Sequence, residues 1–115
     1  MSWLRASVLL LVAVLTVGAC GQRPSMRSAA APSDPQLELG QRVHANRCAS
    51  CHGRAGDGGV GPKLGDGAVV STFPDAADHR AVVVEGRNTM PAWGKTLSAQ
   101  EIDSVVRFQR EALGR

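Results

Sequence analysis

The sequence predicts a single all-α domain, and three observations lead to that prediction. None of its segments alternates apolar and polar residues as a half-buried strand does. Residues 98–101 carry the sequence signature of a helix start, and apolar residues follow at helical spacing. Residues 74–86 are typical of a second, short helix that ends at a glycine. The chain has 115 residues, so it holds one domain at most.

Residues 1–19 are typical of an export signal. Arg5 gives a positive start, and residues 6–17 form an uncharged run of mostly Leu, Val and Ala. This run is too short to cross a bilayer, which takes about 20 residues. Small residues precede Cys20, which resembles a bacterial lipobox, so we expect Cys20 to be the lipidated first residue of the mature protein. The alternative is an ordinary cleaved signal beside an incidental cysteine.

Residues 20–35 are predicted to form a flexible tether. They hold Arg, Pro, Ser and Ala with almost no large apolar residue apart from Met26. Such a segment cannot bury enough surface to order itself. Leader, lipid and tether together predict an exported, membrane-anchored lipoprotein that faces the periplasm or the cell exterior.

The globular part is predicted to span residues 36–115, and its first segment fits a helix with one apolar face. That face consists of Leu37, Leu39, Val43 and Cys48. Residues 53–67 are rich in glycine and are expected to form a loop. Residues 56–61 match G-x-G-x-x-G, but no strand precedes them, so a dinucleotide site is excluded by context. These glycines are expected to let the backbone pass close to a cofactor.

The last predicted helix has the clearest local signal. Ser98 and Glu101 make a capping box, and Leu97 with Ile102 can form the hydrophobic staple. Its expected apolar face is made of Ile102, Val105, Val106 and Phe108.

The segment Cys48-Ala49-Ser50-Cys51-His52 reads C-x-x-C-H, the attachment motif of a covalently bound c-type haem. Two thiols at this spacing can form thioether links to one haem, and the following histidine can bind the iron. Two alternatives remain at this point. One is a redox dithiol, although no βαβ pattern accompanies the pair. The other is a zinc site with His44 and His52 as further ligands, although no second C-x-x-C is present.

Composition fits one covalent haem. After the leader the only aromatic residues are Phe73, Trp93 and Phe108, so a haem would supply apolar volume that the side chains lack. From residue 34 onward ten basic and ten acidic side chains balance. With no basic stripe among aromatic residues, nucleic acid is not an expected partner.

A second iron ligand is expected downstream of His52. Met90 lies in a polar loop that Pro91 stiffens, which is unusual for a methionine that merely fills a core. A thioether ligand raises the haem potential and closes the sixth position. His79 is the other candidate, but it is followed by Arg80 and is expected on the helix surface. We therefore assign Met90 as the distal ligand.

With these residues, the chain from about Gln36 to Leu113 resembles the class I cytochromes c of the small bacterial monohaem type. The resemblance implies N- and C-terminal helices that cross over a covalent haem, with Gly40 at the crossing against Val105 and Phe108. It implies that the Pro62 carbonyl accepts a hydrogen bond from the axial His52. The position four residues after Gly40, often aromatic in the family, is His44, so looser packing is expected there.

The function expected from this reading is single-electron transfer, not enzymatic catalysis. A haem bound by both His52 and Met90 leaves no iron position for a substrate, and no acid–base constellation accompanies it. Expected partners are redox proteins such as a membrane oxidase, reductase or dehydrogenase, with the chain itself a monomer. Two alternatives stay open: a haem subunit of a larger oxidase or dehydrogenase, and a weakly ligated haem that acts as a peroxidase or gas sensor.

Overall fold

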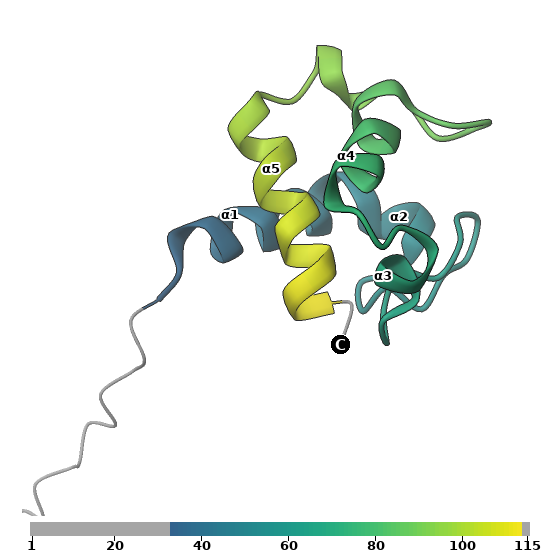
Figure 1. Ribbon diagram of the computed structural model, residues 1–115, viewed down its shortest axis with the longest axis horizontal. Coiled ribbons are helices and arrows are strands. Elements are labelled where there is room, and N and C mark those ends of the chain that lie inside the picture. Colours follow the sequence, from purple (N-terminus) through teal and green to yellow (C-terminus); the bar gives the residue numbers. More distant parts are fainter. Residues whose placement is uncertain (1–32, 114–115) are drawn as a thin grey trace, which may run out of the picture. The chain divides into compact units, whose positions relative to one another are not determined.

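The computed structural model describes residues 33–113, and these residues form a small all-α fold (Figure 1). Its α-helices are α1 (Pro35–Val43), α2 (Ala49–His52), α3 (Ala68–Thr72), α4 (Ala76–Glu85) and α5 (Ala99–Phe108). Two π-helical segments, His44–Cys48 and Gln109–Leu113, extend α1 and α5, and a 3₁₀ turn covers Trp93–Lys95. Within residues 33–113 the only β-type pairing is an isolated bridge between Arg87 and Met90. The all-α prediction is confirmed.

Helix α1 begins one residue before the predicted boundary of the globular part. The Asp34 carboxylate caps it by accepting hydrogen bonds from the backbone N–H groups of Gln36 and Leu37. Pro35 occupies the first turn, where its missing N–H is no loss. Asp followed by Pro is a helix-start signal, so Asp34 and Pro35 belong to the folded domain and not to the tether.

Helices α1 and α5 cross each other at a glycine (Figure 1). A Cβ on Gly40 would collide with the Ser104 carbonyl oxygen and would lie 2.6 Å from Cβ of Phe108. Val105, on the same face of α5, is fully buried. The contact between the N- and C-terminal helices is therefore made backbone against backbone, and only glycine permits it.

The predicted capping box of α5 is present. The Ser98 hydroxyl accepts from the backbone N–H of Glu101, and the Glu101 carboxylate accepts from the backbone N–H of Ser98 at 2.8 Å. Leu97 and Ile102 are both buried in the same apolar cluster, as a hydrophobic staple requires.

The expectation of loose packing around His44 was wrong. The side chain is 2% exposed, and its ring lies 5.7 Å from the ring of Phe108. Its Nε2 donates to the Gly53 carbonyl oxygen at 3.1 Å, and its Nδ1 lies 3.2 Å from Nε2 of Gln109. Hydrogen bonds on both ring nitrogens replace the purely apolar contact that an aromatic ring would make.

Helix α4 lies within the predicted range and has the predicted ends. Asp75 caps its start by accepting from the backbone N–H of Ala77, and Gly86 ends it with a φ of +74°. Helix α3 was not predicted, because five residues are too few to show a helical period. The glycine-rich stretch 53–67 is a loop, as expected.

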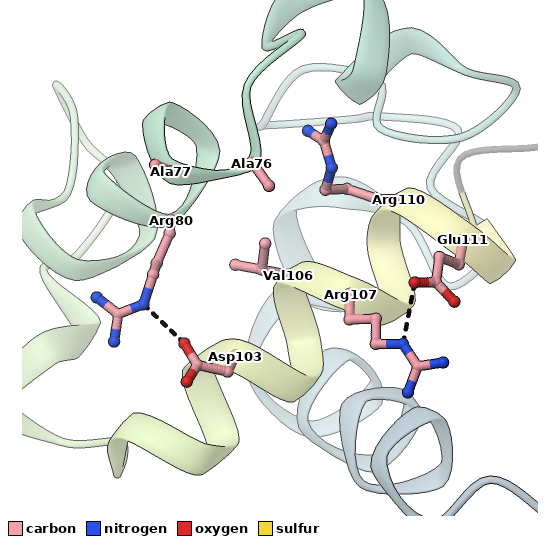
Figure 2. Close-up of a pocket in the computed structure, with 8 residues that line it drawn as sticks. All are labelled: Ala76, Ala77, Arg80, Asp103, Val106, Arg107, Arg110 and Glu111. Atoms are coloured by element: carbon pink, nitrogen blue, oxygen red, sulfur yellow. Dashed lines mark hydrogen bonds and ion pairs between the residues drawn. The ribbon is translucent and has the colours of Figure 1, made fainter.

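One ion pair joins α4 to α5, and a second lies along α5 and the turn that follows it (Figure 2). Arg80 pairs with Asp103 at 2.7 Å, and Arg107 pairs with Glu111 at 2.9 Å. Arg110 donates to the carbonyl oxygens of Phe73 and Pro74, which ties α5 to the loop before α4. These contacts border a shallow groove of about 320 Å³. Among residues 33–113, no helix is long and apolar enough to cross a membrane.

Candidate haem site

The main cavity of the domain has a volume of about 540 Å³ and is enclosed by α2, α3, α4 and the loops that follow α2 and α4. It collects the globular residues that the sequence predicted to hold the cofactor: Cys48, Cys51, His52, Pro62 and Met90. Its size falls within the range of small-molecule and cofactor sites, roughly 300–1,000 Å³. Five residues spread over 42 positions of sequence therefore meet at one cavity.

His52 is the last residue of α2, and a hydrogen bond fixes its ring. Its Nδ1 lies 2.8 Å from the carbonyl oxygen of Pro62, so Nδ1 carries the proton and donates it. Gly61 allows this approach, because a Cβ at that position would lie only 2.6 Å from Cε1 of His52. Nε2 is then the nitrogen that is left for a metal, and the Pro62 contact increases its donor strength.

The two cysteines of the motif have different surroundings. Cys48 is 7% exposed, and burial raises the pKa of its thiol to about 11. Cys51 is exposed at the mouth of the cavity. One thiol therefore lies on the inner wall and the other at the rim, which suits two attachment points on one large planar group.

Met90 reaches the cavity from the loop that follows α4. A tight turn forms this loop: the N–H of Met90 donates to the carbonyl of Arg87 at 2.9 Å, and Asn88 adopts a φ of +53°. The side chain of Met90 is half-buried and packs against the apolar cluster. The turn therefore places Met90 in the lining of the cavity.

The prediction that His79 is a surface residue was wrong. It is 3% exposed, lines the cavity and stacks on Phe73 with ring centroids 5.7 Å apart. Burial, with a smaller effect from the Arg110 charge, lowers its pKa from 6.5 to about 4, so the imidazole is neutral at neutral pH. The adjacent Arg80 suggested exposure, but neighbouring helix residues point about 100° apart.

Gln109 is a cavity residue that the sequence interpretation missed. It is 3% exposed, directly follows α5 and hydrogen-bonds His44. A clue was available, since it stands four residues after the buried Val105 and so lies on the same helix face.

A zinc site is not formed by the described residues. Within 33–113, no three His, Cys, Asp or Glu side chains gather as a metal-binding group would require. The donor set of the cavity instead has the imidazoles of His52 and His79, two thiols and one thioether. They surround a large space with Leu64, Val69 and Val83 in its walls. This set suits a haem that is attached by Cys48 and Cys51.

Comparisons with known proteins agree with this chemistry. Residues 35–108 match the family described as cytochrome c oxidase, cbb3-type, subunit III. The chain is 30% identical over 84 residues to the chloroplastic cytochrome c6 of Chlamydomonas reinhardtii, covering 70% of this chain and 57% of that protein. It is 35% identical over 83 residues to the cbb3-type cytochrome c oxidase subunit FixP of Azorhizobium caulinodans, covering 69% of this chain and 28% of FixP. The chain thus spans less than two thirds of either relative.

Solved structures show the same fold. Cytochrome cL from Methylophaga aminisulfidivorans matches with a TM-score of 0.60 and 26% identity, over 71% of this chain and 58% of that one. Cytochrome c6 from the diatom Phaeodactylum tricornutum matches with a TM-score of 0.58 and 24% identity, over 67% of this chain and 93% of that one. The chain therefore belongs to the cbb3-type cytochrome c oxidase subunit III family, and its described part is a monohaem class I c-type cytochrome domain.

Proposed function

We propose that this protein is a single-electron carrier with one covalent haem c, bound by His52 and Met90. The observation that supports it most strongly is the His52 Nδ1 to Pro62 carbonyl hydrogen bond at the wall of a cavity that also holds both motif cysteines and Met90. A haem in this cavity supplies an iron that changes by one electron between its ferric and ferrous states.

The protein side chains hold the group and limit its chemistry. Cys48 and Cys51 would hold the haem through thioether bonds. The S–H of each thiol would add across one vinyl group, so that the S–H bond and the C=C π bond break as a C–S and a C–H bond form, and attachment would need no net oxidant. His52 would bind the iron through Nε2, with its ring held in place by the Pro62 contact. Met90 would supply the second protein ligand and so would keep substrates and gases from the iron.

The mouth of the cavity is the exchange surface in this proposal. Cys51 is exposed there, and Val60 beside it is 84% exposed, the highest value among the described large apolar residues. A monomeric domain can meet a redox protein at this edge and pass an electron over a short distance. The relatives named for an oxidase favour a membrane oxidase among the possible partners.

A membrane anchor at Cys20 is part of the proposal. Cys20 and most of the tether lie outside the described residues, so support comes from the sequence pattern of leader, cysteine and polar segment. A Cys20→Ser variant is expected to move from the membrane fraction to the soluble fraction, with mature mass checked to exclude an uncleaved leader. Unacylated, wholly soluble wild-type protein would refute the anchor.

A fixed subunit of an oxidase or dehydrogenase is the second candidate, favoured by the likeness to FixP over 28% of that protein's length. Purification from native membranes in mild detergent distinguishes the two. A carrier elutes as a monomer, whereas a subunit elutes with a larger complex.

Intact mass and redox titration of the purified protein test the main proposal. The mass should exceed that of the processed chain by one haem, and the titration should follow a one-electron curve. Protein without covalent haem would overturn it.

A further inference from the structure

Three buried polar side chains lie at or behind the inner wall of the cavity, and the haem attachment described above uses none of them. They are His44 at the end of α1, His79 on α4 and Gln109 after α5, each at most 3% exposed. Gln109 and His79 line the cavity, and His44 lies behind Gln109, to which it is hydrogen-bonded. Burying polar groups is unfavourable unless they hydrogen-bond one another. The burial of these three side chains must therefore be offset by the contacts that they make.

The hydrogen bonds of His44 fix which atoms of His44 and Gln109 donate and which accept. Nε2–H of His44 donates to the Gly53 carbonyl, so Nδ1 of His44 must accept, and Nε2 of Gln109 donates to it. The carboxamide oxygen of Gln109 is then left as an acceptor, on a residue that lines the cavity.

His79 lines the cavity together with Gln109, and its ring stacks on Phe73. The Gln109 side chain beside it partly opposes the burial that lowers the pKa of His79. Nδ1 of His79 is fully buried and has no partner among residues 33–113, so the edge of the ring that reaches Gln109 and the cavity is the Nε2 edge. A neutral imidazole and an amide oxygen thus form a polar section in an otherwise largely apolar wall.

The network also connects to the residue that is expected to bind iron. Gly53, which accepts from His44, directly follows His52. The π-helical turns that contain His44 and Gln109 meet at their hydrogen bond. Inserted π-turns are frequent at functional sites, because they shift a side chain out of the regular helical register.

We propose that His44, Gln109 and His79 form one positioning network that makes the haem environment more polar and lowers its reduction potential. The proposal rests on the proposed haem function. Ferric haem carries one more positive charge than ferrous haem, so dipoles that present oxygen and lone pairs to the cavity stabilise the ferric state. An apolar wall would favour the ferrous state.

Redox titration of haem-loaded variants tests this proposal. Gln109→Leu is expected to raise the midpoint potential, and Gln100→Leu, at an exposed position on α5, should leave it unchanged. Adding His79→Leu to Gln109→Leu should raise the potential by less than the sum of the single shifts, because the two residues act together.

Gln109→Glu keeps the shape and adds a carboxylate, so it should lower the potential and make it depend on pH. A shift opposite to that of Gln109→Leu distinguishes an effect on the haem potential from a merely structural role. The Gln109→Glu variant also provides the test if Gln109→Leu does not acquire haem. Unchanged potentials in folded, haem-loaded Gln109→Leu and Gln109→Glu would overturn the inference. Absence of haem from the wild type would instead overturn the proposed function.

Discussion

The Nδ1 atom of His52 lies 2.8 Å from the carbonyl oxygen of Pro62, and Gly61, next to Pro62 in the glycine-rich loop, makes this distance possible. The loop therefore does more than connect helices. It brings one backbone carbonyl against the back of the imidazole, which sets the tautomer and leaves Nε2 for the iron.

Gly61→Ala is expected to displace the His52 ring, because the new Cβ would lie 2.6 Å from Cε1. A weaker Pro62 hydrogen bond makes the imidazole a poorer donor, so the midpoint potential should rise. Ser71→Ala, at an exposed position outside the cavity lining, is the control and should not shift it. An unaltered potential and spectrum in Gly61→Ala would show that the loop does not hold the ring.

Gly40→Ala should destabilise the protein, because the added methyl collides with the α5 backbone at Ser104. Helix propensity alone predicts a gain of about 1 kcal/mol, whereas overpacking costs roughly 1–3 kcal/mol. Denaturant unfolding of the haem-loaded variant shows whether the free energy of unfolding falls or rises. Gln41→Ala, exposed in the same helix, reports propensity without the clash. Increased stability in Gly40→Ala would contradict the close crossing.

Stability should fall as the pH drops from about 6.5 toward 4. The pKa of His79 is lowered from 6.5 to about 4, chiefly by burial and then by the charge of Arg110, so the unfolded chain binds more protons in this window. The contribution of neutral His79 to the free energy of unfolding is fully present above pH 6.5 and is lost as the pH falls toward 4. It is on the order of 3 kcal/mol at most. His44, whose pKa burial also lowers, adds in the same direction.

Unfolding of haem-loaded protein at several pH values checks this expectation. His79→Leu should flatten the dependence between pH 6.5 and 5, where the carboxylates with lowered pKa values, such as Asp34 and Glu101, still stay ionised. A slope that persists in His79→Leu would assign the effect to other groups.

Cys51→Ala should weaken or abolish covalent haem and lower stability, since the cavity of about 540 Å³ would lose its contents. Acid–acetone extraction followed by mass spectrometry measures attachment. Ser50→Ala, also at the cavity rim, is the matched control and should keep its haem. A stable, haem-free Cys51→Ala protein would show that the fold does not depend on the group.

Local signals in the sequence predicted local features well. The capping box at Ser98 and the glycine end of α4 each rest on short-range chemistry, and the structure contains both. The glycine crossing at position 40 and the Pro62 contact with His52 were expected only through family resemblance, and both are present.

Long-range polar packing could not be predicted in the same way. His44, His79 and Gln109 are separated by up to 65 positions, and each alone resembles a surface residue. Only the crossing of α1 and α5, with α4 beside them, brings the three together and away from water. The burial of His79 therefore depends on tertiary structure and cannot be inferred from the residues next to it in the sequence.

Carbon monoxide titration of the ferrous wild-type protein tests the central claim most directly, because the claim is that His52 and Met90 close both axial positions of one covalent haem. The absorption spectrum should stay unchanged under carbon monoxide, whereas Met90→Ala should bind the gas and show a shifted Soret band. Ready binding of carbon monoxide by the wild type would contradict the carrier function and favour a gas-binding or peroxidase role.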